Sequence, residues 1–323
     1  MDFRNIIRTS FRLSAAFVAL FVASAATAPA QPALTTIHFI SSPSDDLRPL
    51  LYAQSAGLFQ KAGLNVVIDK AASGGVVAQA IIGGADDIGK ASLVSLIAGY
   101  ARGVPFALIA PSAIHLKDDA NSGIMIPANS PIKSVLDLQG KVVGCTAIGD
   151  IGYLGTRAMI DSMGGDSATV KWVEIPIASL AATVEQGRIV AGLTTEPYMS
   201  KDLASGKFRI LTDMLNGYSK PILESAFFST RDYAAKNHDA VVKFAKVMSQ
   251  ASAYANTHIS QTLPLMVSFS GMDPDAAAKM HKTQTALAFD PSALQPVIDA
   301  AAKYQIIPKG FSARDMLALP KPE

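Results

Sequence analysis

The residues of this sequence that could contact a small molecule are hydroxyl, glycine and carboxylate residues at the ends of predicted strands. Ser92 is the clearest case, because it follows a short strand, predicted to be buried, at 87–89 and precedes an apolar helical run at 93–100. A hydroxyl and free backbone N–H groups at a helix start satisfy polar ligand atoms without carrying a net charge. Open α/β sheets bind their ligands at such strand ends. Ser92 is therefore predicted to face a ligand.

Five turns share this position after a strand and before a helix, and we expect them to converge on one site. The predicted ligand-binding residues in these turns are Ser41, Ser42, Ser73, Gly74, Ser92, Thr146, Asp150, Tyr153, Thr194 and Glu196. For each serine or threonine the alternative is a hydroxyl that only caps its own helix. For Tyr153 the alternatives are stacking on a planar ligand and packing in the core.

The sequence lacks the usual signatures of catalysis. It has no G-x-S-x-G elbow, no Walker A loop and no G-x-G-x-x-G fingerprint. The five histidines are not spaced as paired metal ligands with a nearby acidic residue. We therefore predict no catalytic residue, no metal site and no cofactor, and expect a protein that is not an enzyme.

Two stretches about one hundred residues apart repeat the same order of elements. In residues 74–92, GGVVAQAIIGGADDIGKAS, a small helix ends at Gly83 and Gly84 and a strand follows. In the second stretch a helical run at 180–184 ends at Gly187, and a strand at 189–193 leads to Thr194. The repetition suggests two similar lobes, and the alternation of strands and helices favours mostly parallel sheets.

The first thirty residues are predicted to be a targeting signal. Arg4, Arg8 and Arg12 form a positive region, residues 13–22 form an apolar region, and Ala28-Pro29-Ala30 resembles a cleavage site. The apolar run is too short and too rich in alanine and serine for a membrane span. We expect a cleavable signal peptide at 1–30 and export to the periplasm; an uncleaved anchor is the alternative.

Composition limits the partners that the exported chain can have. The formal net charge is +2, and removal of residues 1–30 leaves 25 basic and 25 acidic residues in a chain of 293. Without a cluster of Lys and Arg we expect no binding to nucleic acid or to an acidic membrane. Cys145 is the sole cysteine, so an intramolecular disulfide is impossible, and we expect a buried and inert thiol.

Several segments resemble one family in the order in which that family has them. They are GGADDIGKAS at 83–92, VEQGRIVAGLTTEP at 184–197, PLLYAQSAGLF at 49–59 with GLNV at 63–66, and IKSVLDLQGKVVG at 132–144. The sequence is similar, from Thr35 to its end, to periplasmic solute-binding proteins of the nitrate/sulfonate/taurine and thiamine-pyrimidine type. Val190 departs from the family, which often has an acidic residue there.

The resemblance implies a two-lobed type II periplasmic binding protein fold. Each lobe is expected to be a mixed, mostly parallel sheet flanked by helices, with the ligand cleft between the lobes. We predict that residues 31–127 and 222–323 form the first lobe and that 128–221 form the second. The first crossover is expected at 127–131 and the return crossover at 215–228.

The resemblance also implies the function of a substrate-binding component of an ABC importer. Such a protein captures a small organic solute and delivers it to a permease in the inner membrane, and we expect a monomer. The alternatives are an enzyme on the same fold, related to pyrimidine-precursor synthesis, and a sensory ligand-binding module. The latter would need a fused signalling segment, which we do not expect.

The charge of the ligand is left open by the sequence. Lys90 and Arg157 are the main basic residues near the predicted turns, and Asp150 and Glu196 would repel an anion. These residues favour a neutral, cationic or heteroaromatic solute. Helix N-termini can hold an oxyanion, however, so a sulfonate, nitrate or taurine-like solute is the alternative.

Overall fold

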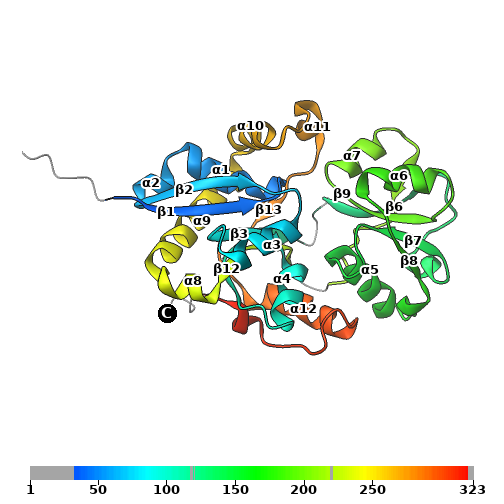
Figure 1. The fold of residues 1–323 in the computed structure, drawn as a ribbon. Coiled ribbons are helices and arrows are strands. Elements are labelled where there is room, and N and C mark those ends of the chain that lie inside the picture. Colours follow the sequence, from blue (N-terminus) through cyan, green and yellow to red (C-terminus); the bar gives the residue numbers. More distant parts are fainter. Residues whose placement is uncertain (1–32, 117–118, 120, 219–220, 319–323) are drawn as a thin grey trace, which may run out of the picture. The chain divides into compact units, whose positions relative to one another are not determined.

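Four strands from residues 35–111 and one strand from residues 225–230 form a mixed sheet, here called the first sheet (Figure 1). A computed structural model describes residues 33–116, 119, 121–218 and 221–318; the predicted signal peptide at 1–30 lies outside them. The strand order is β2 (Leu64–Lys70), β1 (Thr35–Ser41), β3 (Ile88–Ser92), β12 (Ser225–Thr230) and β4 (Phe106–Pro111). β1 runs parallel to β2 and β3, whereas β12 runs antiparallel to β3 and β4.

Successive side chains on the strands of the first sheet point to opposite faces, and both faces are buried. On β1, Ile37 and Phe39 enter one hydrophobic cluster and Ile40 enters another, as the two-residue period of a strand requires. The cluster of Phe39 includes side chains of α1 (Arg48–Ser55), α2 (Leu58–Lys61), α8 (Arg231–Lys236), α9 (His238–Thr257) and α10 (Ile259–Ser270). The cluster of Ile40 includes side chains of α3 (Gly74–Gly83), α4 (Leu93–Ala101) and α12 (Pro291–Lys303).

A second sheet of five strands is built from the middle of the chain. Its order is β10 (Phe208–Ile210), β6 (Ser122–Pro127), β9 (Ala191–Thr195), β7 (Val142–Cys145) and β8 (Lys171–Glu174). Leu154 of α5 (Ile151–Ser162) packs in the cluster on one face, and Leu180 of α6 (Ile177–Glu185) packs in the cluster on the other. α7 (Tyr198–Leu203) follows β9. Each of the two sheets, with its helices, forms one lobe.

The parallel share of these sheets is smaller than the sequence predicted. β7 runs parallel to β8 and β9, but β6 runs antiparallel to β9 and to β10. Each sheet therefore has two parallel and two antiparallel pairings, and the expectation of mostly parallel sheets is wrong. The antiparallel strands flank the segments on which the chain passes from one sheet to the other. The βαβ pattern in the sequence describes only strands within one sheet and so could not predict their direction.

A small third sheet lies where the chain passes between the two large ones. β5 (Ala113–His115) pairs antiparallel with β11 (Ile222–Leu223) and with β13 (Gln284–Thr285). The chain leaves β5 for β6 through residues 116–121 and returns from β10 to β11 through residues 211–221. β6 already belongs to the second sheet, so the crossover precedes Ser122 instead of lying at 127–131 as predicted.

The ends of the helices follow the sequence signals. Ser73 begins α3 as its N-cap, and Gly84 ends it in the left-handed conformation with a φ of 71°. Asp273 begins α11 (Pro274–Lys279) and Asp290 begins α12, each with proline at the first helical position. α8 is Arg231–Lys236, and the short 3-10 helices are η1 (Asp45–Leu47), η2 (Val135–Leu138), η3 (Ser167–Thr169) and η4 (Ala313–Met316).

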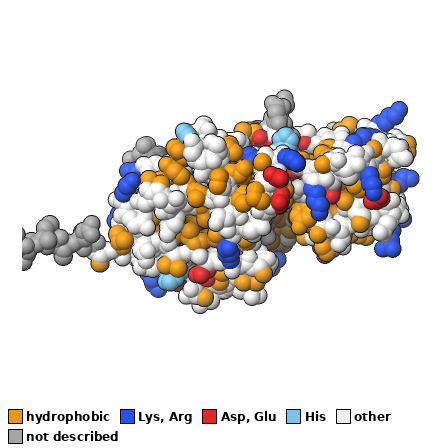
Figure 2. All heavy atoms as spheres, turned by 90° about the horizontal axis from the view of Figure 1, so that it is seen from above, with side chains coloured by type: hydrophobic (Ala, Val, Ile, Leu, Met, Phe, Trp, Pro, Cys, Tyr) orange, Lys and Arg blue, Asp and Glu red, His pale blue; other side chains and the backbone are white. Residues whose placement is uncertain are grey.

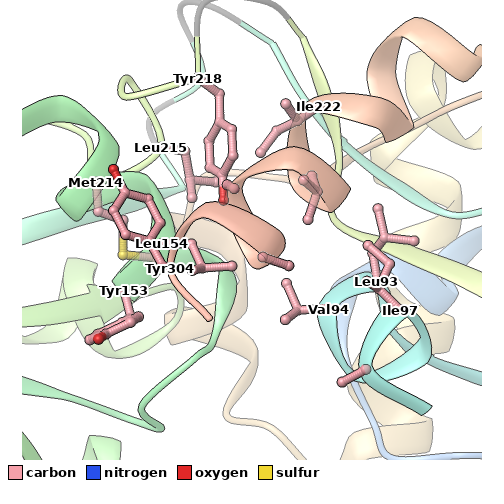
Figure 3. Packing of buried hydrophobic residues seen from close by; sticks show 14 of the residues in the cluster. Leu93, Val94, Ile97, Tyr153, Leu154, Met214, Leu215, Tyr218, Ile222 and Tyr304 are labelled. Atoms are coloured by element: carbon pink, nitrogen blue, oxygen red, sulfur yellow. The ribbon is translucent and has the colours of Figure 1, made fainter. Parts of the chain in front are cut away.

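One hydrophobic cluster contains side chains from both lobes. It includes Val94 and Ile97 of α4, Leu154 of α5 and Tyr304 directly after α12, and Figure 3 shows these side chains around α12. α12 belongs to the first lobe but packs against α5 as well as α4. Burial of this apolar surface holds the lobes together at the α12 side.

Candidate ligand-binding site

A cavity of about 540 Å³ is lined by residues of both lobes. This volume is within the range of small-molecule sites. The first lobe contributes α3, α4, the start of β4 and Ile306, and the second lobe contributes the turn before α5. The lining residues are Gly74, Gly75, Ala78, Ile82, Ser92, Val94, Ser95, Ala98, Gly99, Arg102, Val104, Phe106, Ala147, Ile148, Gly149, Asp150 and Ile306.

The start of α3 brings backbone donors to this cavity. Ser73 accepts a hydrogen bond from the backbone N–H of Val76 at 3.5 Å, so its side chain caps the helix and does not line the cavity. Gly74 and Gly75 are exposed there, and their N–H groups belong to the first helical turn, where no intrahelical acceptor exists. The donors available to a ligand are thus the glycine amides.

Ser92 lies at the end of β3 and at the N-cap of α4, as the sequence predicted. Its side chain makes no capping hydrogen bond, and the first amide of α4, that of Leu93, donates to the carbonyl of Glu224 at 2.8 Å. Ser92 and Ser95 are exposed and both line the cavity. The hydroxyl of Ser92 is not used to cap its own helix and is free to contact a ligand.

The turn before α5 is held together by Asp150. One carboxylate oxygen accepts from the backbone N–H of Tyr153 at 2.7 Å, and the other accepts from the Thr146 hydroxyl at 2.6 Å. Burial raises the pKa of Asp150, although these hydrogen bonds oppose the shift. Asp150 lines the cavity, whereas Thr146 does not, because its hydroxyl is directed to the carboxylate.

The remaining predicted residues lie outside the cavity lining. Ser41 is buried and its hydroxyl donates to the backbone carbonyl of Ser42 at 2.9 Å. Tyr153 is buried, and its hydroxyl accepts from Arg157 at 2.9 Å. Thr194 is fully buried, and Glu196 accepts from the backbone N–H of His281 at 3.2 Å. The structure brings together Gly74, Ser92 and Asp150, and their contact with a ligand stays a prediction.

Sequence reasoning missed the apolar part of the site. Ala78, Ile82 and Ala98 line the cavity from the first lobe, and Ile148 lines it from the second. A signal was present, because Gly74, Ala78 and Ile82 follow each other at spacing four and therefore share one face of a helix. The exposed fractions of Ile82 and Ile148 are 53% and 51%, which is unusual for isoleucine.

The two basic residues named from the sequence are engaged elsewhere. Lys90 is buried, and its ammonium lies 2.6 Å from one carboxylate oxygen of Asp46 and 2.7 Å from the Ser44 hydroxyl. Arg157 donates to Ser167 and Tyr153, and its guanidinium lies 4.4 Å from the ring centre of Tyr304. Neither side chain lines the cavity.

In the part of the chain that the structure describes, no group of three or more His, Cys, Asp or Glu residues is placed to hold a metal ion. Cys145 is buried, and burial raises the pKa of its thiol to about 12, so it is protonated at neutral pH. Within the same described residues, no helix is both long and apolar enough to cross a bilayer.

Comparison with solved structures identifies the class of fold. The periplasmic aliphatic sulphonate binding protein SsuA of Escherichia coli aligns with a TM-score of 0.73 at 20% identity, over 88% of this chain and 97% of that one. SsuA of Xanthomonas axonopodis pv. citri, bound to MOPS, aligns at 0.68 and 17%, over 88% and 99%. A Candida albicans protein described as having the generic periplasmic binding protein fold aligns at 0.68 and 14%, over 88% and 96%. The chain has the two-lobed periplasmic binding protein fold.

Comparison of sequences identifies the family. The NMT1/THI5-like family model matches residues 45–261, which is more than half of the chain. A protein of Escherichia coli K12 named as an aliphatic sulfonates-binding protein is 26% identical over 203 residues, or 61% of this chain. The matched region spans 62% of that protein's length. The chain belongs to the NMT1/THI5-like family.

Proposed function

We propose that this protein is the periplasmic substrate-binding component of an ABC importer. It captures a small organic solute in the cavity between its lobes and delivers it to a permease in the inner membrane. The observation that carries the proposal is that Gly74 and Ser92 of one lobe and Asp150 of the other line the same cavity. The sulfonate-binding names of the relatives support this role, and the low identities leave the solute itself open.

Export is part of the proposal. The charged and apolar pattern of residues 1–30 and the periplasmic names of the structural relatives both support a cleaved signal peptide and release into the periplasm. The protein acts as a monomer that binds and releases its solute unchanged. It has no enzymatic step and does not bind nucleic acid.

Ligand capture proceeds by closure of the lobes. The hinge lies between β5 and β6 and between β10 and β11, because the chain crosses between the large sheets there. The first lobe comprises residues 34–115 and 222–318, and the second comprises residues 122–210. Since the cavity needs residues from both lobes, the solute binds the closed form more tightly and shifts the population toward it.

A binding screen tests the function. The chain from Gln31 is purified free of bound solute and heated with sulfonates, nitrate, taurine, aromatic carboxylates, amino-pyrimidines and uncharged aromatic compounds. A solute at one hundred times its Kd adds about 2.7 kcal/mol to the free energy of unfolding, which is a shift of roughly 5 °C or more. Small-angle scattering should then show a smaller radius of gyration with the same compound.

A matched pair of variants assigns the binding to the cavity. Ala78→Phe fills the cavity from α3, whereas Gln79→Phe places the same ring on the exposed position next to it. The thermal shift should disappear in the first variant and persist in the second. A folded protein that responds to no compound, or that responds equally in both variants, would refute the proposed function at this site.

A further inference from the structure

We infer that the cavity selects an uncharged, predominantly apolar solute, in contrast to the sulfonates for which its relatives are named. This inference rests on the proposed function, because it concerns the solute that the same cavity holds. It is carried by the side chains that line the cavity and by the partners of the charged groups around it.

Two isoleucines from opposite lobes are exposed at this cavity. Ile82 on α3 and Ile148 on the turn before α5 both line it, and each leaves about half of its side-chain surface accessible, 53% and 51%. Ile306, Val104 and Phe106 add further apolar surface. Transfer of such surface from water to a ligand is favourable by about 25 cal/mol per Å². The cavity therefore favours a ligand with an apolar body.

Small residues in the cavity wall leave space for an apolar ligand. Ala78 and Ala98 place only a methyl group at the wall, and Gly74 and Gly75 place no side chain there. Gly99 has a further reason to be glycine, because a Cβ atom would lie 2.6 Å from the ring of Phe106. A cavity of about 540 Å³ with these walls is wide enough for a fused or substituted ring system.

The cavity offers little compensation for an anion. Among the described residues that line it, Arg102 is the sole cation, and it is the exposed C-cap of α4. Ser92 is the N-cap at the other end of this helix, ten residues from Arg102, which is about 15 Å along the helix axis. A sulfonate bound at the Ser92 hydroxyl would thus lie far from Arg102 and would share the cavity with the carboxyl group of Asp150.

The nearby Lys90 cannot supply that charge. Its ammonium contacts both carboxylate oxygens of Asp46, at 2.6 and 2.8 Å, and the Ser44 hydroxyl at 2.7 Å. Moving it to a ligand would leave the carboxylate of Asp46 buried without its cation, which is strongly unfavourable. Apart from Arg102 and Asp150, the polar groups that line the cavity are uncharged: the amides of Gly74 and Gly75 and the hydroxyls of Ser92 and Ser95.

Two fluorescent probes that differ in one sulfonate group test the inference. N-phenylnaphthylamine is uncharged, and anilinonaphthalenesulfonate has the same rings with an added sulfonate. Titrated into the mature chain, the uncharged probe should bind at least about tenfold more tightly, because the cavity does not repay the desolvation of the sulfonate. Ala78→Phe should weaken its binding by a similar factor, and Gln79→Phe should leave it unchanged.

The result that overturns the inference is equal or tighter binding of the sulfonated probe. Loss of that binding in Arg102→Gln would identify Arg102 as the anion partner and would overturn it as well. Failure of the uncharged probe to bind the wild type would contradict an apolar cavity. If the sulfonate is preferred while the ligand screen still produces closure, the proposed function stands and only the inference about the solute falls.

Discussion

The Nε2 atom of His115 lies 2.7 Å from the Oδ2 atom of Asp213, and this pair joins the two segments on which the chain passes between the sheets. His115 ends β5, and Asp213 follows β10. The other oxygen of Asp213 accepts from the hydroxyl of Ser122, the first residue of β6, at 2.8 Å. The carboxylate of Asp213, on the segment that leads from β10 to β11, thus contacts both ends of the segment that leads from β5 to β6.

This pair predicts a pH dependence of stability. Burial alone would lower the pKa of His115, but the hydrogen bond and charge of Asp213, with the charges of Glu224 and Asp119, raise it above 6.5. Burial raises the pKa of Glu224 from 4.5 to about 7; the charges of Asp46, Asp213 and Asp119 add to this and His115 opposes it. In the folded state both groups bind protons more tightly than in the unfolded chain.

Because the pKa values of both groups are raised in the folded state, protonation of these groups stabilises the fold. The contribution of Glu224 is complete below pH 4.5 and is lost as the pH rises through about 7, and that of His115 is complete below 6.5 and is lost above it. The free energy of unfolding should therefore fall as the pH rises from about 5 to about 8. Urea unfolding at several pH values measures it. His115→Gln should flatten the curve, and a variant with the wild-type slope would contradict this assignment.

The buried pair of Lys90 and Asp46 predicts a large loss of stability on removal of the cation. Burial would raise the pKa of Asp46, yet Lys90 and the hydroxyls of Ser225 and Ser44 lower it to about 2, so the carboxylate is charged. Lys90→Met leaves this charge without its cation and should cost about 3–5 kcal/mol in urea unfolding. Adding Asp46→Leu should recover much of the loss. A small effect of Lys90→Met alone would contradict a buried ion pair.

Two glycines in helices predict opposite effects of the same substitution. A Cβ atom on Gly155 of α5 would lie 2.5 Å from the backbone oxygen of Met214, so Gly155→Ala should destabilise the protein by about 1–3 kcal/mol. A Cβ atom on Gly83, the last residue of α3, would meet nothing within 4 Å. Gly83→Ala should be neutral or stabilise by up to about 1 kcal/mol. Equal effects in thermal unfolding would refute the close approach at α5.

The local elements were predictable because their signals are local. The strand that contains Ile88, the helix cap at Ser73 and the place of Ser92 between strand and helix all follow from spacing and capping within about twenty residues. The division into two sheets followed from the repeated order of elements. The direction of β6 did not, because its partners Thr195 and Phe208 lie more than 65 residues away in the chain.

The site was less predictable because it depends on contacts that sequence patterns do not report. Lys90 was expected near the ligand, but its partner Asp46 precedes it by 44 residues and removes its charge from the cavity. Ile148 was not expected at all, because its exposure results from the turn that Asp150 holds. The position of Ser92 at a strand end was predictable, whereas the hydrogen bond from the Thr146 hydroxyl to Asp150 required the structure.

The contact between Glu196 and His281 predicts that closure can be weakened without loss of fold. The carboxylate of Glu196 in the second lobe accepts from the backbone N–H of His281 in the first lobe at 3.2 Å. It also accepts from the backbone N–H and the hydroxyl of Ser200 within its own lobe. If the lobes close on the solute, the first hydrogen bond exists only in the closed form and adds to the apparent affinity.

Glu196→Ala should therefore weaken binding of N-phenylnaphthylamine by about threefold to tenfold, the equivalent of one partly exposed hydrogen bond. Ser200→Ala is the control, because it removes the hydroxyl partner within the second lobe and leaves the carboxylate opposite His281. Its affinity should match the wild type, and fluorescence titration measures both. Urea unfolding of the two variants separates closure from folding. Equal loss of affinity in both variants would show that Glu196 acts within its own lobe and not across the cleft.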